Sequence, residues 1–405
     1  MKLPPDVSQI IDTLTSNGHE AYIVGGCVRD SIMGVTPKDW DITTSAKPEQ
    51  VVDIFPRTFE TGIKHGTITV LINRQGYEVT TYRIDGEYLD SRRPQQVTFT
   101  TSIEEDLSRR DFTMNAIAYN LSSGFVDPFG GQADISKEII RCVGSAECRF
   151  GEDALRMLRA VRFAGQLGFV IDDEAILAIK MQRENLANIS AERIREELTK
   201  LIISSHVEAL SLLEITGLLP YAVVGYDYPG SIKRTIGLLT NSPKHEAMRW
   251  ALFLAFSGKA YVDILRGLRF DNKTIREVSL YVSLLSIDIP HSRYEIKKLL
   301  RQMSQESKEK CQLYFENLLT LQEIINPHDT ERLAAVRLES QDIQTKGECY
   351  TLRDLSVNGD DLFAAGVPRG KAMGEKLEEL LDEVMRDPSK NAFFRKYFKS
   401  EASQS

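Results

Sequence analysis

Two aspartates separated by one residue, Asp39 and Asp41 in KDWDI, are the most chemically suggestive feature of this sequence. The stretch DWDITT alternates in polarity, which predicts a strand. Alternate side chains of a strand share a face, so the two carboxylates would lie together, with Trp40 and Ile42 facing the core. Adjacent carboxylates repel each other unless a cation lies between them, and oxygen ligands suit Mg²⁺. The pair is a candidate metal site, and the alternative is a solvated strand end.

A glycine pair, Gly25 and Gly26, follows the short apolar strand AYIV and leads into a predicted helix. Glycine lets a backbone approach a phosphate closely, and a helix N-terminus favours anions. Arg29 follows on the first turn. The alternative is a tight strand-to-helix turn with Arg29 and Asp30 as a surface ion pair. A phosphate site beside a metal site indicates phosphoryl or nucleotidyl transfer.

Further candidates lie downstream. Glu78 in YEVTTYR would be a third carboxylate on a neighbouring strand, or else a plain exposed residue. In LSRRDFTMNAIAYN, Arg110 could reach a triphosphate. Asp111 and Asn115 are four residues apart, on one face of the helix expected there, and could hold a sugar hydroxyl. A purely structural role for Asp111 is to cap that helix.

The segment GEDALRMLRAVRF carries Asp153, Arg156, Arg159 and Arg162 at every third position. On one helix neighbouring members share a face, and Phe163 would pack on the other side. The alternative is an ordinary charged face with i,i+3 ion pairs. Aspartate accepts hydrogen bonds and arginine donates them. Asp153 beside Arg156 therefore matches the edges of cytosine and adenine and opposes those of uracil and guanine, provided that the helix faces the nucleotide.

Composition restricts the class of protein. The 405 residues carry a net charge of -8, which disfavours a general nucleic-acid coat protein. Five cysteines without CxxC spacing argue against a disulfide framework and a zinc site, and favour a cytoplasmic location. The longest apolar run, WALFLAF, is too short for a membrane span and predicts a buried helix.

The elements that must position these residues form a mixed head followed by helices. A helix is predicted over about 5–17, strands over 21–24 and 96–100, and a hairpin over 66–84 that turns near Gln75 and Gly76. DGEYLDSRRP (85–94) is a predicted loop. Beyond about residue 140 helical periodicity dominates, ending in the amphipathic GEKLEELLDEVM. The fold class is α+β, with an N-terminal mixed sheet and all-helical domains after it.

Seven segments resemble, in order, those of class II bacterial tRNA nucleotidyltransferases, the CCA-adding enzymes of the polymerase-β-like superfamily. They are GGCVRD, KDWDI, EVTTYRIDGEYLDSRRP, RRDFTMNAIA, DPFGG, GEDALRMLRAVRF and AERIREEL. The resemblance implies that Asp39 and Asp41 bind Mg²⁺ and that Glu78 joins them. AERIREEL would buttress the base-reading helix. The nucleotide-binding residues would be Gly25, Gly26, Arg29, Arg110, Asp111, Asn115, Asp153, Arg156, Arg159 and Arg162.

The resemblance also implies domains and an activity. The domains would be a catalytic head (1–140), a base-reading neck (141–205), a body (206–320) and a tRNA-binding tail (321–405). The expected reaction is template-independent addition of C, C and A to the 3′ end of tRNA from CTP and ATP, with two metals and release of pyrophosphate. The alternatives are an enzyme that adds only the A and a bacterial poly(A) polymerase. We expect a monomer or homodimer that contacts the acceptor and TΨC arm and no membrane.

Overall fold

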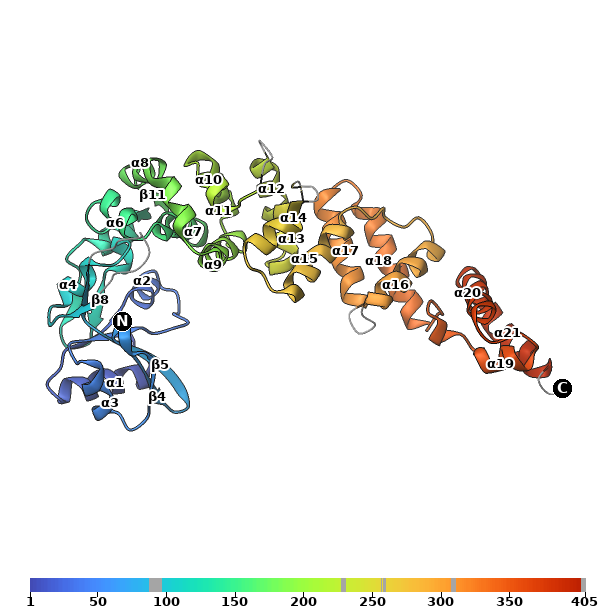
Figure 1. The fold of residues 1–405 in the computed structure, drawn as a ribbon, viewed down its shortest axis with the longest axis horizontal. Helices are drawn as coiled ribbons and strands as arrows, with labels where there is room; N and C mark the ends of the chain where they lie inside the picture. The colour runs from blue at the N-terminus through green and yellow to red at the C-terminus, as the bar shows by residue number, and fades with distance from the viewer. Residues whose placement is uncertain (87–96, 227–230, 256, 258–259, 307–310, 402–405) are drawn as a thin grey trace. The chain divides into compact units, whose positions relative to one another are not determined.

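A computed structural model describes residues 1–86, 97–226, 231–255, 257, 260–306 and 311–401. The chain divides into two compact units, Met1–Arg276 and Glu277–Ser405. The first contains the mixed sheet and the second is helical within its described residues, so the predicted fold class is confirmed (Figure 1). The division falls inside the predicted body domain, and the four-domain boundaries stay a prediction.

The head is built on a seven-stranded sheet of order β3-β4-β5-β2-β1-β8-β9. β2 and β5 run parallel, and the other neighbours are antiparallel. Apolar residues such as Ile23, Ile42 and Val79 are buried in its core. The strands are β1 (Ala21–Val24), β2 (Ile42–Thr44), β3 (Thr58–Gly62), β4 (Thr67–Ile72), β5 (Gln75–Thr81), β8 (Ala118–Asn120) and β9 (Gly124–Val126).

Short helices join these strands. The predicted first helix is confirmed, and its apolar face, Val7 to Leu14, is buried. The hairpin turns at Asn73 and Arg74, which both have positive φ, and not at Gln75 and Gly76, which already pair with β4. The remaining elements of the head are α1 (Pro5–Ser16), α2 (Gly26–Ile32), α3 (Pro48–Ile54), β6 (Arg83–Asp85), β7 (Val97–Phe99), α4 (Ile103–Ser108) and α5 (Gly131–Ser136). Most of the predicted loop 85–94 lies outside the described residues.

From residue 139 onward, the described segments form helices and one two-stranded sheet of β10 (Ile139–Ile140) and β11 (Val170–Ile171). WALFLAF lies mostly in α13 (Glu246–Leu254), whose residues from Ala247 to Leu254 are buried. The other helices of the first unit are α6 (Ala146–Glu152), α7 (Leu155–Leu167), α8 (Asp173–Gln182), α9 (Ala191–Ile202), α10 (Ser211–Ile215), α11 (Leu219–Ala222), α12 (Ser231–Thr240) and α14 (Tyr261–Gly267).

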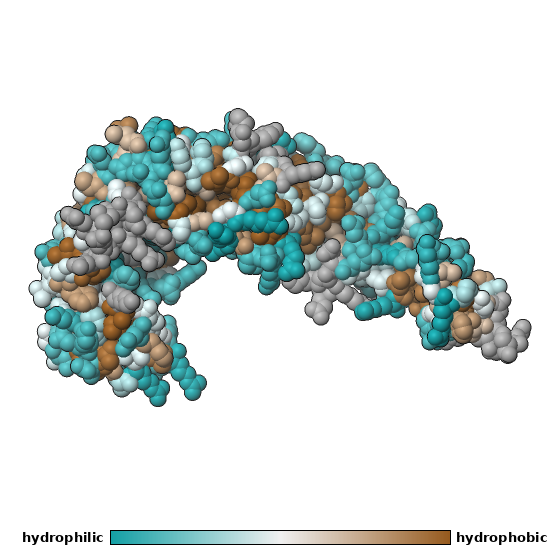
Figure 2. Space-filling model, viewed as in Figure 1, coloured by the Kyte–Doolittle hydropathy of each residue, from teal (hydrophilic) through white to brown (hydrophobic). Residues whose placement is uncertain are grey.

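The second unit packs its own cores. The predicted amphipathic C-terminal segment forms α20, and its buried Leu380, Leu381 and Val384 pack in one cluster with α19 and α21. Hydrophilic residues cover much of the face shown in Figure 2, with smaller hydrophobic groups between them. No described helix has the length and apolar character to cross a membrane. The helices are α15 (Asn272–Leu284), which begins in the first unit, α16 (Arg293–Glu306), α17 (Cys311–Ile325), α18 (Thr330–Thr345), α19 (Gly359–Ala364), α20 (Lys371–Arg386) and α21 (Ser389–Glu401).

Candidate active site

The aspartate pair lies just before β2 and not on it, so its predicted place within a strand is wrong. Asp39 is in a bend, and Asp41 immediately precedes Ile42. The carbonyl of Asp41 accepts the last hydrogen bond of this ladder, from Val24 N at 3.0 Å. β1 ends at Val24, and the chain turns into α2 at Gly25. The residues before Asp41 therefore have no β1 residue to pair with. Trp40 is half-buried and lines a cleft beside the N-terminal segment, not the sheet core as expected.

The two carboxylates fit a divalent cation. Both Asp39 and Asp41 are exposed. Desolvation raises the pKa of Asp41, Arg110 lowers it, and repulsion from Asp39 raises it, with a raised pKa as the net result. Such a pair ionises together most readily when a cation neutralises it. Asp39 and Asp41 are therefore the residues that would hold the metal.

Glu78 lies on the strand next to this pair. β2 and β5 are parallel, and Ile42 is opposite Val79, so Asp41 and Glu78 each stand one residue before that register pair. Glu78 is exposed. Within the described residues, no three His, Cys, Asp or Glu side chains gather closely enough to hold a metal ion. Glu78 stays a predicted third ligand.

The glycine turn brings backbone and arginine together. Gly25 has φ +78° and precedes α2, so it adopts a conformation that other residues rarely take. A Cβ on Gly25 would stand 3.0 Å from Nη1 of Arg110, and one on Gly26 3.7 Å from Nη2 of Arg29. The Arg110 Nε is buried without a hydrogen-bond partner. A guanidinium packed against a glycine turn at the start of a helix is suited to a phosphate oxygen.

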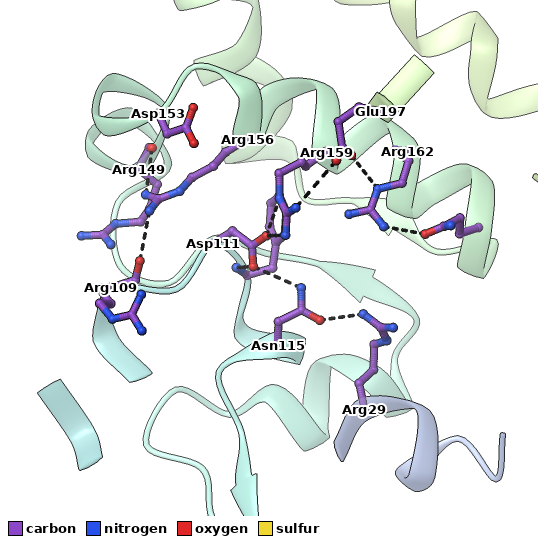
Figure 3. A network of polar contacts seen from close by, with 12 residues as sticks. Arg29, Arg109, Asp111, Asn115, Arg149, Asp153, Arg156, Arg159, Arg162 and Glu197 are labelled. Carbon is purple, nitrogen blue, oxygen red and sulfur yellow. Dashed lines mark hydrogen bonds and ion pairs between the residues drawn. The ribbon is translucent and has the colours of Figure 1, made fainter. Parts of the chain in front are cut away.

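Arg29 and Asp111 are connected through Asn115 (Figure 3). Arg29 donates to Asn115 Oδ1 at 2.7 Å, and Asn115 Nδ2 donates to Asp111 Oδ1 at 3.1 Å. Arg29 also pairs with Asp30 at 2.6 Å, as the structural alternative expected, although Arg29 is buried. The helix predicted after Asp111 is only the 3-10 turn Thr113–Asn115, because Asp111 accepts from the next backbone N–H and Asn115 folds back onto it.

Asp111 joins the head to the neck helix α7. Its Oδ2 accepts from Arg159 Nε at 2.9 Å and from Nη2 at 2.5 Å. Burial alone would raise the pKa of Asp111, but Arg159 and Asn115 outweigh it and hold the pKa well below its ordinary value. Asp111 is therefore ionised, and its acceptors are already engaged by the protein.

Asp153 and Arg156 do not share a helix. Asp153 ends α6 in extended conformation, and α7 begins at Leu155, so the prediction of one continuous helix is wrong. The Asp153 carboxylate accepts from Leu155 N at 3.1 Å, which starts the new helix, and from Arg193 of α9 at 2.6 Å. Arg156 donates to the carbonyls of Arg149 and Arg109, each at 3.1 Å. Acceptor and donor are thus fixed by separate partners.

Arg162 and Phe163 are placed differently from the expectation. Arg162 donates to Glu197 of α9 at 2.7 Å, and its guanidinium lies 3.5 Å from the centre of the Phe163 ring. Arg29 and Arg159 also lie over that ring, at 5.2 and 5.5 Å. Phe163 therefore packs against the arginines and not on the opposite face. Glu197 and Arg193 both belong to AERIREEL, so this segment does contact Arg162 of α7 and Asp153, whereas base reading by these residues stays a prediction.

The structure thus brings most of the predicted residues together. Gly25, Arg110 and Asp41 gather at the head. A series of side-chain hydrogen bonds that begins at Arg29 and ends at Arg159 connects the head to α7, whereas Arg162 turns toward α9. Sequence reasoning missed Asp106, which is fully buried and pairs with Arg110. One signal was available, since Asp106 is three residues after Ile103 and next to Leu107, on the apolar face of a short helix.

Three protein-family models match successive parts of the chain. Residues 21–141 match the poly A polymerase head domain, 168–224 a probable RNA and SrmB-binding site of polymerase A, and 241–392 a putative domain 2 of tRNA nucleotidyltransferase. The CCA-adding enzyme of Geobacillus kaustophilus is 40% identical over 399 residues, which is 96% of this chain and 94% of that relative. The Geobacillus stearothermophilus CCA-adding enzyme is 39% identical over 381 residues, 93% and 90% of the two chains.

Solved structures of CCA-adding enzymes also match the fold of this chain. The Bacillus stearothermophilus CCA-adding enzyme in complex with CTP matches with a TM-score of 0.79 and 33% identity, over 100% of both chains. The Thermotoga maritima CCA-adding enzyme complexed with tRNA matches with a TM-score of 0.65 over 95% and 92% of the two chains, and at 19% identity it supports the fold alone. The family implies a divalent metal. Sequence, fold and the arrangement of the head and neck residues place this chain in the family of CCA-adding enzymes, the tRNA nucleotidyltransferases.

Proposed function

We propose that this enzyme adds C, C and A to the 3′ end of tRNA, taking CMP and AMP units from CTP and ATP and releasing pyrophosphate. The observation that carries the proposal is the exposed pair Asp39 and Asp41 beside the end of β1, where Val24 donates to the Asp41 carbonyl and Arg110 packs against the Gly25 turn. This arrangement offers a cation site and a phosphate site side by side. It is the equipment of nucleotidyl transfer onto a hydroxyl, and it requires no protein nucleophile.

Each residue has a role in this proposal. Asp39 and Asp41 hold Mg²⁺, with Glu78 on the adjacent strand as the third ligand. When bound, the metal supplies Lewis-acid charge to the attacking and leaving oxygens. The Gly25 N–H already donates to the Ile117 carbonyl at 3.2 Å, so Arg110 and the backbone of Gly26 hold the triphosphate at the turn that Gly25 makes. The α-phosphorus then faces the 3′-hydroxyl of the tRNA.

The ribose and the tRNA are held by different groups. Asp111 and Asn115 lie at the ribose, where Arg159 holds Asp111 and Arg29 holds Asn115, so that the two residues form a fixed part of the site. The helical remainder binds the tRNA by its backbone and shape, with the acceptor and TΨC arm as the proposed contact. These substrates belong to the cytoplasm.

Base choice rests on the Asp153 carboxylate and the Arg156 guanidinium. The carboxylate accepts from the amino group of cytosine or adenine, and the guanidinium donates to the neighbouring ring nitrogen or carbonyl. Uracil and guanine present a carbonyl and a ring N–H instead. The Asp153 carboxylate would then face the carbonyl, which is also an acceptor, and the Arg156 guanidinium would face the N–H, which is also a donor. Arg193 of α9 and the Arg149 and Arg109 carbonyls hold the two side chains in place. Arg159 and Arg162 steady α7, the helix that carries Arg156, through Asp111 and Glu197.

The test is extension of three forms of one tRNA, ending before the first C, after one C and after both. We expect the purified enzyme with Mg²⁺ to add the missing residues in each case and then to stop. Extension with UTP alone would contradict the base-reading roles. Continued adenylation would indicate a poly(A) polymerase, and extension of only the third form would indicate an A-adding enzyme. Neither alternative is favoured, because the relatives that match over nearly the whole chain are CCA-adding enzymes.

A further inference from the structure

Asp106 is a fully buried carboxylate beside the nucleotide site, and none of the roles above includes it. It lies on α4 between Ile103 and Leu107, which are also buried. Burying a carboxylate without compensation is costly, so its surroundings must supply charge and hydrogen bonds.

The two oxygens of Asp106 contact three parts of the head. Oδ1 accepts from the backbone N–H of Arg83 at 3.3 Å, and from Arg109 Nε at 3.0 Å and Nη2 at 2.8 Å. Oδ2 accepts from Thr43 Oγ1 and from Arg110 Nη2, both at 3.3 Å. One carboxylate therefore joins the strand that follows Asp41, the start of β6 and both arginines of the RRD segment.

Arg110 depends on this contact for its position. Nη1 faces the Gly25 turn at 3.0 Å from a Cβ built there, Nη2 donates to Asp106, and Nε is buried without a hydrogen-bond partner. The charge of Arg110 also acts on Asp41. Asp106 thus fixes the inner side of a guanidinium whose outer side is directed toward the candidate phosphate site.

The same segment supports the base-reading arginine. The carbonyl of Arg109 accepts from Arg156 Nη2, and the carbonyl of Ser108 from Arg149 Nη1, each at 3.1 Å. Burial by itself would raise the pKa of Asp106, but Arg110 and Arg109 outweigh it and keep the carboxyl below its ordinary pKa. Asp106 is therefore charged wherever the enzyme works, and it holds a segment that touches both ends of the nucleotide site.

We propose that Asp106 is a positioning residue that aims Arg110 at the triphosphate. The inference rests on the proposed function, because it assumes that Arg110 meets the triphosphate. It predicts that loss of the Asp106 charge weakens recognition of the phosphates far more than recognition of the nucleoside.

The experiment compares CTP with CMP as ligands of the full-length enzyme carrying Asp106→Asn. We expect CTP to bind about tenfold more weakly, the size of effect typical of a lost charged hydrogen bond, whereas CMP affinity, measured by competition, changes less than twofold. A merely structural role would weaken both ligands together and lower the melting temperature. The matched control is Glu104→Gln, the same carboxylate-to-amide change on the exposed face of α4.

Each outcome decides the question. Unchanged CTP affinity in D106N, or equal losses for CTP and CMP, would overturn the positioning role. Should D106N not fold, Thr43→Val removes one donor from Oδ2 with little change of shape, and it must show the same CTP-specific loss to a smaller degree. Failure of the unmodified enzyme to extend tRNA would instead refute the proposed function, so the two failures are distinguishable.

Discussion

The carboxylate of Asp153 accepts a hydrogen bond from Arg193 at 2.6 Å, so the acceptor assigned to the base edge is held by α9 across from its own segment. Arg193 is about one-third exposed and Asp153 less so. The pair leaves carboxylate lone pairs available to an incoming amino group, while Arg193 sets the plane of the carboxylate. Base choice is therefore predicted to depend on a residue that need not touch the base.

Arg193→Met is predicted to reduce the preference for CTP over UTP, because Asp153 can then rotate away from the base edge. The expected loss is about tenfold, in the range of a charge-assisted hydrogen bond. The measurement is single-nucleotide incorporation with each triphosphate in turn. Arg195→Met on the same helix is the control, since Arg195 lies over Phe270 and not beside Asp153. An unaltered preference would mean that Asp153 is oriented by other contacts.

Asp41→Asn is predicted to reduce CMP incorporation by about 1,000-fold or more, because the charge that a metal supplies to phosphoryl transfer is worth several kcal/mol. Binding of tRNA should persist, since the change is confined to the head. Filter binding and incorporation assays separate the two. Asp53→Asn, an exposed aspartate on α3, is the matched control. Near-normal turnover in D41N would refute the metal-binding role of Asp41.

Gly25→Ala is predicted to weaken CTP binding, because the new methyl group would stand 3.0 Å from Nη1 of Arg110 in a backbone with φ +78°. Steric displacement of Arg110 and backbone strain both contribute. Gly18→Ala separates them, since Gly18 has φ +84° and nothing within 4 Å of its Cβ position. Both variants should lose about 1 kcal/mol of stability through strain, and only Gly25→Ala should lose CTP affinity. Equal CTP affinity in both would argue against a crowded phosphate turn.

Glu348→Gln is predicted to destabilise the second unit by roughly 3 kcal/mol at neutral pH, because it leaves Lys297 buried without a counter-charge. Lys297 Nζ lies 2.6 Å from Glu348, is fully buried, and also donates to the Met385 carbonyl of α20 at 3.1 Å. Hydrogen exchange of peptides from α16 and α20 would report the loss locally. Glu375→Gln, at an exposed position of α20, is the control.

The same variant has a defined pH dependence. Hydrogen bonds from Arg293 and Lys297 outweigh burial and lower the pKa of Glu348 below its ordinary value of 4.5. A carboxylate with a lowered pKa stabilises the fold above its unfolded pKa, and that contribution is lost as the pH falls through the folded value. The difference in the free energy of unfolding between wild type and E348Q should therefore be largest at pH 7 and shrink below about pH 4.5. A constant difference across this range would show that the charge of Glu348 is not its source.

The sequence by itself determined the class of fold and the inventory of the site. Apolar periodicity is local, so the first helix with its buried Val7 and Leu14, the strand AYIV and the amphipathic α20 could all be predicted within a few residues. The glycine pair, the two aspartates and the arginine series were recognisable because their chemistry depends on residue type and close spacing.

Only the tertiary structure decided where strands and helices stop and which charges meet. The strand predicted through Asp39 begins at Ile42 because β1 ends before Gly25. The helix predicted through Asp153 begins only at Leu155, whose N–H donates to the Asp153 carboxylate. The partners of Asp111, Asp153 and Asp106 lie 48, 40 and 63 residues away in the contacts with Arg159, Arg193 and Thr43. Such pairings are set by how α7 meets the head, how α9 meets the segment before α7 and how α4 meets β2, and local sequence patterns carry no record of them.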